Sequence, residues 1–224
     1  KSAWVSFVGG SSGLLPYGGD GTKAFTVKVN PDDSVNAGEE QTVYIQGKDG
    51  TNVKCNAELI VIVGQSYGAS ISMTSSQLNN IEPGTSATTS VTVENTGNGV
   101  DNFRITPSSV PSGWTVELEK SLVTLDSKHT PNRKDTIDVT VTLPDDALAT
   151  EVVLIDLSIG SNAGGEPYDD VTLSVSVAAV HGFEADSTAL TQTGKNGNEV
   201  KFPFDIENTG NVEDDFRLSV IQQT

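Results

Sequence analysis

A motif that occurs twice, at residues 91–98 and 204–211, is the feature that most constrains how this chain can fold. The first copy reads Val-Thr-Val-Glu-Asn-Thr-Gly-Asn, and the second reads Phe-Asp-Ile-Glu-Asn-Thr-Gly-Asn. A phenylalanine follows each copy at the same distance, as Phe103 and Phe216. Self-similarity at a fixed spacing indicates a repeated structural unit. The sequence therefore predicts tandem units with a period of about 113 residues.

Other landmarks agree with this period and define its phase. Pro-Asp-Asp occurs at 31–33 and again at 144–146, and Trp4 and Trp114 fall into nearly the same register. The landmarks divide the chain into the C-terminal part of one unit (1–66), a complete unit (67–180) and the N-terminal part of another (181–224). The two partial units are complementary, since each lacks the strands that the other has.

Each unit is predicted to be built from β-strands. In the complete unit, apolar residues alternate with polar ones around Val91, Phe103, Ile137, Ile155 and Leu173, and turn residues separate these stretches. Such alternation is typical of strands with one buried face, and no stretch has a helical apolar stripe. About seven short strands at this spacing predict an all-β fold of tandem immunoglobulin-like (Ig-like) β-sandwiches.

The motif residues also resemble a known group of domains. Val-Glu-Asn-Thr-Gly-Asn at 93–98, Pro-Ser-Gly-Trp-Thr-Val at 111–116 and the strand that runs into Pro144 are similar to the NPCBM-associated (NEW3) and CARDB-type domains. These belong to secreted or surface proteins of archaea and bacteria. The resemblance implies an Ig-like module of a surface-layer protein, an adhesin or a secreted hydrolase.

Composition excludes several classes of partner. The formal net charge of −17 argues against nucleic acid, because phosphate binding needs clustered Lys and Arg. The longest apolar run, 59–63, is far shorter than the roughly 20 residues that span a bilayer.

Cys55 is the only cysteine, which excludes an internal disulfide and leaves a thiol that is buried or free. The chain begins at Lys1 without a signal peptide, which indicates a piece of a longer product.

No catalytic constellation stands out, so the chain is not expected to be an enzyme. His129 and His181 are the only histidines, and neither lies in a recognisable motif. Aromatic residues at equivalent positions are instead expected to build the core. The predicted structural core residues are Trp4, Trp114, Phe103 and Phe216.

Acidic doublets near strand ends are the candidate metal ligands, although no cofactor is expected. Calcium binds six to eight oxygens and can take them from carboxylates between modules. No complete calcium-loop motif is present, and solvated turn carboxylates are the commoner case. The calcium candidates are Asp32, Asp33, Asp145, Asp146, Asp169 and Asp170.

Two isoleucines are the candidate interface residues. Ile60 and Ile62 lie on the outward side of a predicted strand, where the complete unit has Ser174 and Ser176. Either a loop or neighbouring module covers them, or they form a subunit contact, because exposed apolar strand residues favour association.

These observations predict a structural, extracellular or cell-surface protein without membrane insertion in this segment. Its modules would form part of a surface layer, stalk or filament, with other copies of the chain or flanking modules as partners. The partial units would be completed head-to-tail by another copy or by flanking sequence of the same chain. The alternative is a spacer or carbohydrate-binding accessory region of a secreted hydrolase or adhesin.

Overall fold

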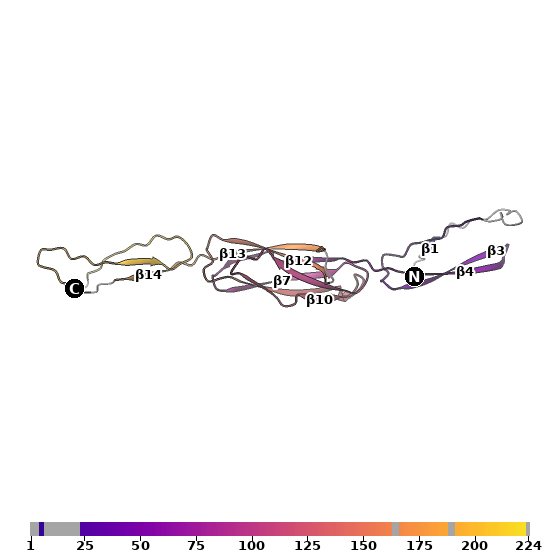
Figure 1. Ribbon diagram of the computed structural model, residues 1–224, viewed down its shortest axis with the longest axis horizontal. Coiled ribbons are helices and arrows are strands. Elements are labelled where there is room, and N and C mark those ends of the chain that lie inside the picture. The colour runs from indigo at the N-terminus through magenta and orange to yellow at the C-terminus, as the bar shows by residue number, and fades with distance from the viewer. Residues whose placement is uncertain (1–4, 7–22, 163–165, 188–190, 223–224) are drawn as a thin grey trace.

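The regular secondary structure of the described residues is almost all β-strand, and the chain is arranged as three parts in a row. The computed structural model describes residues 5–6, 23–162, 166–187 and 191–222. These contain fifteen strands and one short 3-10 turn, Pro131–Arg133, and no α-helix. A complete sandwich lies between an N-terminal and a C-terminal segment, and the molecule is elongated (Figure 1). No helix within the described ranges is long and apolar enough to cross a membrane.

The central sandwich consists of nine strands in two sheets. One sheet has the order β5-β7-β11-β9, and the other has the order β10-β8-β12-β13-β6, with β13 and β6 parallel and the other pairs antiparallel. The strands are β5 (Ala69–Met73), β6 (Gln77–Ile81), β7 (Ser86–Asn95), β8 (Asp101–Ser108), β9 (Thr115–Leu118), β10 (Leu122–Leu125), β11 (Lys134–Thr142), β12 (Val152–Ser161) and β13 (Asp169–Val177). The prediction of an all-β, Ig-like sandwich is confirmed. The strand count exceeds the expected seven because β6 and β10 were not predicted from the sequence.

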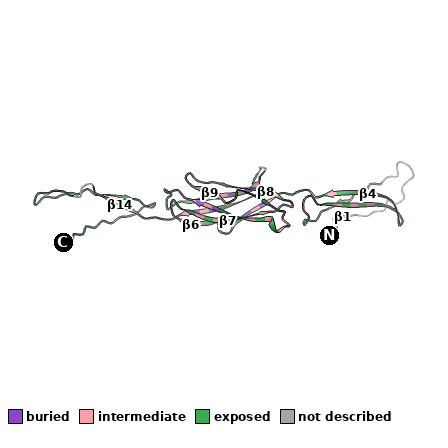
Figure 2. Cartoon of the chain, turned by 90° about the horizontal axis from the view of Figure 1, so that it is seen from below, coloured by how far each residue is buried: buried purple, intermediate pink, exposed green. Residues whose placement is uncertain are grey.

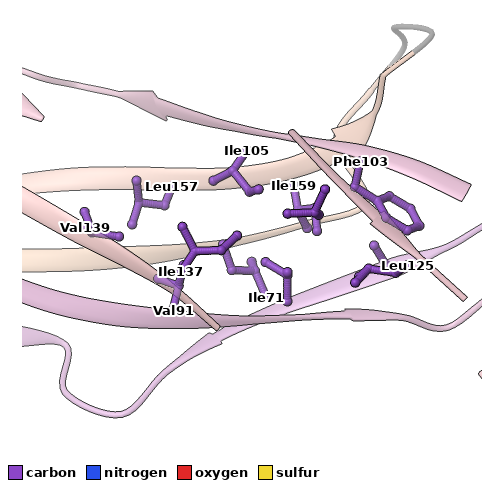
Figure 3. Packing of buried hydrophobic residues seen from close by; sticks show 12 residues of the cluster. Ile71, Val91, Phe103, Ile105, Leu125, Ile137, Val139, Leu157 and Ile159 are labelled. Atoms are coloured by element: carbon purple, nitrogen blue, oxygen red, sulfur yellow. The ribbon is translucent and has the colours of Figure 1, made fainter. Parts of the chain in front are cut away.

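Alternation places one face of each sheet in a shared core. Val91 on β7, Ile137 on β11 and Leu157 on β12 are fully buried, and they meet between the two sheets (Figure 3). Trp114 lies in a second cluster toward the other end of the sandwich, with 7% of its surface exposed. The buried aliphatic side chains remove a continuous apolar surface from water, which is the main stabilising contribution to such a fold.

The N-terminal segment repeats two strand pairs of the central sandwich. It contains β1 (Val5–Ser6), β2 (Lys28–Val29), β3 (Glu40–Asp49) and β4 (Asn52–Ile62). In the β3–β4 hairpin Val43 lies opposite Leu59, just as Ile155 lies opposite Leu173 in β12–β13. β1 and β2 pair in the antiparallel sense, as do β9 and β11. Strands β3 and β4 form a two-stranded sheet, so neither has a second neighbour in the described segment.

The C-terminal segment repeats the first strand pair. β14 (Phe183–Asp186) pairs with β15 (Asp205–Asn208), and Ala185 lies opposite Ile206. The corresponding pair in the central sandwich is Ile71 opposite Val93. The segment has no second sheet in its described residues, so its apolar residues are exposed or half-buried (Figure 2).

Candidate functional site

The asparagine turn between β7 and β8 of the central sandwich organises the contact of the sandwich with the N-terminal segment. Asn95 is 1% exposed, and its Oδ1 accepts a hydrogen bond of 2.8 Å from the Gly97 N–H. Its Nδ2 donates to the carbonyl oxygens of Gly99, Leu125 and Asp126. Because Asn and Gly readily adopt tight turns, the Asn-Thr-Gly sequence folds back here. The turn is thereby tied to the loop that follows β10.

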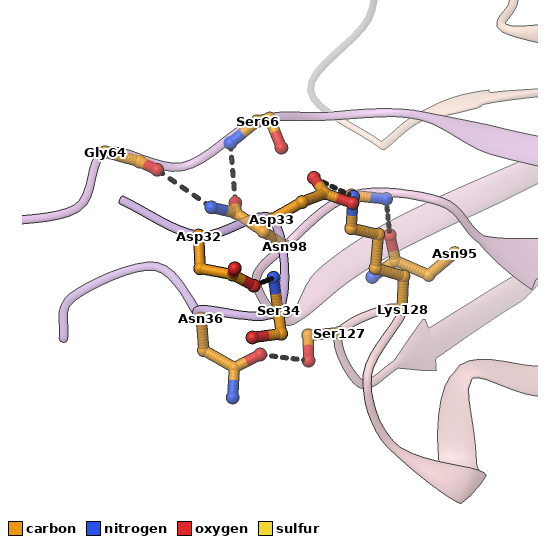
Figure 4. Close-up of polar contacts among 11 residues, drawn as sticks. Asp32, Asp33, Ser34, Asn36, Gly64, Ser66, Asn95, Asn98, Ser127 and Lys128 are labelled. Atoms are coloured by element: carbon orange, nitrogen blue, oxygen red, sulfur yellow. Dashed lines mark hydrogen bonds and ion pairs between the residues drawn. The ribbon is translucent and has the colours of Figure 1, made fainter. Parts of the chain in front are cut away.

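Asn98 then bridges the two parts of the chain. Its Oδ1 accepts from the Ser66 N–H at 2.7 Å, and its Nδ2 donates to the Gly64 carbonyl at 3.1 Å. Its backbone carbonyl accepts from the Ala37 N–H at 2.9 Å. Gly97 permits this approach, because a Cβ atom there would collide with the Ser66 carbonyl oxygen. We call this set of contacts the first junction; Figure 4 shows its polar groups.

The loop between β10 and β11 completes the first junction. Its Lys128 N–H donates to the Gly97 carbonyl at 2.8 Å, and the Lys128 ammonium lies 2.8 Å from Asp33 Oδ1. The neighbouring Ser127 hydroxyl donates to Asn36 Oδ1 at 2.5 Å (Figure 4). The loop therefore contacts both the turn of its own sandwich and the segment that precedes it.

The Lys128–Asp33 ion pair is electrostatically favourable and largely exposed. The hydrogen bond and the positive charge of Lys128 hold the pKa of Asp33 below its ordinary value of 3.8. The Asp33 side chain is nevertheless 92% exposed, so solvent and salt screen the attraction. The ion pair thus orients the loop, and the hydrogen bonds of Asn98 connect the backbones.

The contacts around Asn98 recur in the second copy of the motif, around Asn211. Asn211 Oδ1 accepts from the Val180 N–H at 2.7 Å, and its Nδ2 donates to the carbonyls of Ala178 and Ala147. Its backbone carbonyl accepts from the Ala149 N–H at 3.1 Å. Gly210, like Gly97, could not carry a Cβ, because the Val180 carbonyl oxygen is in the way. We call this set the second junction; it joins the central sandwich to the C-terminal segment.

The hydrogen bonds correct one detail of the sequence alignment. Val35 N–H donates to the Asp32 carbonyl, and Ala147 N–H donates to the Pro144 carbonyl, so Val35 corresponds to Ala147 and Asp32 to Pro144. Asp33 therefore corresponds to Asp145 and not to Asp146. The alignment of the two Pro-Asp-Asp sequences was wrong by a single position, because composition alone does not show which member of a doublet occupies a given turn position.

The second junction has an open pocket. The pocket has a volume of about 410 Å³, and Asp145, Asp146, Leu148, Gly210 and Asn211 are among its lining residues. Asn208, the counterpart of Asn95, is exposed, and its Nδ2 donates to the Val212 carbonyl at 2.8 Å. Of the three acceptors of Asn95, only the Gly99 carbonyl has its counterpart here. The other two, Leu125 and Asp126, belong to the end of β10 and to the loop that follows it.

The calcium candidates do not come together. No group of three or more His, Cys, Asp or Glu side chains that could hold a metal ion occurs among the described residues. Asp33 pairs with Lys128, and Asp169 Oδ2 accepts a hydrogen bond from the Ile71 N–H at 3.0 Å. Asp145 and Asp146 line the pocket of the second junction.

The other singled-out residues lie in different environments. Phe103 is fully buried, whereas Phe216 is half-buried against Phe183, with 5.0 Å between the ring centroids. Ile60 and Ile62 are 62% and 61% exposed. Trp4 lies outside the described residues. Cys55 is a free, exposed thiol on β4.

Sequence reasoning missed the bridging role of Asn98 and Asn211. Both asparagines were recognised as part of the repeated motif, but the motif was interpreted only as a turn. The signal was available in the motif itself, since the asparagine after the glycine recurs although a turn does not require it. The partners of these asparagines lie up to 64 residues away, and only the fold reveals them.

Comparisons with known proteins do not assign this chain to a family. No family model and no curated protein matches the chain, so the specific resemblance to NEW3 or CARDB-type domains gains no support. Similar solved structures include domains 4 and 5 of the S-layer protein SbsC, at 16% identity and a TM-score of 0.34, covering 78% of this chain and 99% of that one. A FixG-related protein from Vibrio parahaemolyticus is 12% identical with a TM-score of 0.37, covering 50% of this chain and 95% of that one. The PapD-like domain 7 of human CEP192 is 10% identical with a TM-score of 0.34, covering 49% and 84%.

Proposed function

We propose that the chain is a non-catalytic, structural spacer, a section of a stiff array of Ig-like modules in an extracellular surface layer, stalk or filament. The observation that carries the proposal is the duplicated junction, in which Asn98 and Asn211 make corresponding hydrogen bonds to the preceding part of the chain. A spacer needs a connection that holds successive modules in one orientation, and this connection is built twice in the same way. The resemblance of the motif residues to NEW3 and CARDB-type domains agrees with this function.

The construction of the junctions suits such a role. Domains joined only by a short linker generally move relative to each other. Here each asparagine satisfies backbone groups of the linker itself, Ser66 and Gly64 at the first junction and Val180 and Ala178 at the second. The linkers are therefore fixed at both ends and have little freedom to bend.

The two end segments require completion by further strands. Leu218 and Val220 are 59% and 100% exposed, and β3 has one free edge within the described segment. Ile159 lies opposite Ile105 and Leu157 opposite Pro107 in the central sandwich. By the observed correspondences, completion would place a Gly47 equivalent opposite Leu218 and an Ile45 equivalent opposite Val220.

Completion has two arrangements. The strands come from a second copy, or from flanking sequence of the same chain. Completion between copies joins different surfaces head-to-tail, and such a contact does not close on itself, so it would produce a filament. Completion within one chain would produce a longer stalk with the same junctions. In either case exposed residues such as Ile60 and Ile62 remain available for lateral contacts.

Distance measurements across each junction test the proposal. Cys55 is an exposed natural labelling site, and an Asp138→Cys variant supplies a second label on β11. For the second junction, Asp138→Cys is combined with Ser219→Cys in a Cys55→Ser background. Pulsed electron–electron double resonance should give a narrow distance distribution for each pair of labels, one pair across each junction. Asn98→Ala should broaden only the first distribution, and Asn211→Ala only the second.

Two exposed asparagines provide matched controls. Asn56 lies on β4 and Asn198 in the C-terminal segment, both away from the junctions. Their replacement by alanine should leave both distributions narrow. Broad distributions in the unsubstituted protein would contradict a stiff spacer. Clear hits for this chain on a glycan array would instead favour the carbohydrate-binding alternative.

A further inference from the structure

We propose that the pocket of the second junction is a docking socket for a basic loop, supplied by the strands that complete the C-terminal segment. This inference rests on the proposed function, because it takes the C-terminal segment to be completed. The socket is defined by Asp145, Leu148, Asn208 and Gly210. Its occupant would be a loop that follows a short edge strand and carries an apolar residue followed by a lysine or arginine. Residues 7–27, which a second copy would supply here, contain no such pair, so the occupant belongs to flanking sequence of the same chain.

The first junction contains the corresponding loop in place. Three groups there hold the segment 125–128: the Asn95 Nδ2 donates to the carbonyls of Leu125 and Asp126, the Gly97 carbonyl accepts from the Lys128 N–H, and Asp33 accepts from the Lys128 ammonium. The loop therefore meets an amide donor, a carbonyl acceptor and a carboxylate.

The second junction offers the same three groups without this loop. Asn208 is exposed where Asn95 is 1% exposed. In the described part of the chain, no backbone hydrogen bond reaches the Gly210 carbonyl, and no ion pair involves Asp145, Asp146 or the nearby Glu82. The pocket of about 410 Å³ is lined by Gly210, Asp145, Asp146 and Glu82, and Asn208 precedes Gly210 by two residues. Its acidic lining therefore suits a loop with a positive side chain.

One difference between the junctions defines the specificity of the socket. Asn36 accepts a hydrogen bond from Ser127 at the first junction, and its counterpart, aligned by the same turn hydrogen bonds, is Leu148. Leu148 is 52% exposed and lines the pocket. An occupant with a serine at the position of Ser127 would meet an apolar surface. The preferred loop therefore has an apolar residue there, followed directly by the basic residue.

A peptide titration on the full chain tests the socket. The probe is a synthetic peptide of residues 122–134, which includes Ser127 and Lys128, added to the isotope-labelled protein. We expect saturable changes in the NMR signals of the Gly210 and Asn211 N–H groups and of the Asn208 side-chain amide. The signals of Gly97 and Asn98 should stay unchanged, because the chain's own loop already occupies the first junction.

Peptide variants test the predicted chemistry. S127L in the peptide should strengthen binding by about threefold to tenfold, because it buries a leucine against Leu148. K128M in the peptide, or Asp145→Asn in the protein, should weaken binding by about twofold to fivefold, as an exposed ion pair allows. Asp170→Asn, which removes an exposed charge outside the socket, should have no effect. Equal binding by all peptides would overturn the proposal.

A tethered version removes dependence on a weak bimolecular affinity. The peptide is fused after Thr224 through a flexible linker of about 15 residues, which raises its effective concentration to roughly the millimolar range. Unchanged NMR signals of Gly210 and Asn208 in the fused protein would also overturn the proposal of a docking socket. The array proposal would survive this failure as long as the distance distributions depend on Asn98 and Asn211.

Discussion

The central sandwich and the C-terminal segment use one strand register with opposite results for burial. Val93 on β7 lies opposite Ile71, and Ile206 on β15 lies opposite Ala185. Val91 is fully buried, whereas its counterpart Phe204 is 51% exposed. Strand pairing and the asparagine turn are thus local properties of the repeated sequence. The core is a property of two facing sheets, and a two-stranded ribbon alone cannot supply it.

The largest expected difference concerns two equivalent phenylalanines. Phe103→Ala should lower the free energy of unfolding of the central sandwich by about 3–5 kcal/mol, because it leaves a cavity in a fully buried cluster. Phe216→Ala should leave that free energy unchanged within about 0.5 kcal/mol, since Phe216 contacts Phe183 in a different segment. Chemical denaturation followed by Trp114 fluorescence in a Trp4→Phe background measures both effects.

The fluorescence of Trp114 provides an internal check on this measurement. With 7% of its surface exposed, its emission should be shifted to the blue of a fully hydrated indole and should move on unfolding. An equal loss of stability from Phe103→Ala and Phe216→Ala would contradict the separation between the central core and the C-terminal segment.

The two turn asparagines provide a second, smaller contrast. Asn95→Ala would leave three carbonyls and the Gly97 N–H without their partner at a buried site. We expect a loss of about 2–3 kcal/mol in the stability of the central sandwich. Asn208 is exposed and makes two such bonds, to Val212 and Gly210. Asn208→Ala should therefore lower the free energy of unfolding by less than about 0.5 kcal/mol. Thermal unfolding by calorimetry compares the two variants. Equal losses of stability in Asn95→Ala and Asn208→Ala would contradict the difference that we expect between the two turns.

The sequence predicts the strands with long, strict alternation and misses β6 and β10, although Val123 and Leu125 of β10 are buried in the core. Around Val91, Ile137, Ile155 and Leu173, strict alternation with β-branched and aliphatic residues identifies strands whose inner residues are fully buried. Strand β6 has the sequence Gln-Leu-Asn-Asn-Ile and pairs in parallel with β13. Its polar composition resembles a loop, and its strand state depends on the neighbouring edge of the sheet.

The site was predictable only to the level of the repeated motif. The recurrence of Asn-Thr-Gly-Asn identifies where equivalent structure occurs, but it does not reveal the contacts of Asn98. The ion pair of Lys128 with Asp33 joins residues 95 positions apart. The chain has 30 Asp and Glu residues, so nothing local shows which carboxylate pairs with Lys128. The acidic doublets suggested calcium because composition does not reveal the partners of a carboxylate; of these residues Asp33 forms an ion pair with Lys128.

The smallest predicted effect is a pH dependence of the first junction. Lys128 lowers the pKa of Asp33 below 3.8, so the ionised carboxylate is more stable in the folded junction than in the unfolded chain. This contribution is fully present above the ordinary pKa and is lost as the pH falls through the lowered value. The distance distribution between labels at Cys55 and Asp138→Cys should therefore broaden slightly between about pH 4 and pH 2.

A Lys128→Met variant separates this effect from the general protonation of an acidic chain. Glu94 also has a lowered pKa, because it accepts hydrogen bonds from Lys134 and Arg133, but these pairs lie within the central sandwich and remain in the variant. In this variant the distance distribution across the first junction should be slightly broader at neutral pH. It should not broaden further as the pH falls through the titration of Asp33. High salt should reproduce this behaviour in the unsubstituted protein, since an exposed ion pair is screened. At the second junction a hydrogen bond with His181 lowers the pKa of Asp214, so a response to acid there would not depend on Lys128. A first-junction response of unchanged size in the Lys128→Met variant would show that the Asp33–Lys128 pair does not cause it.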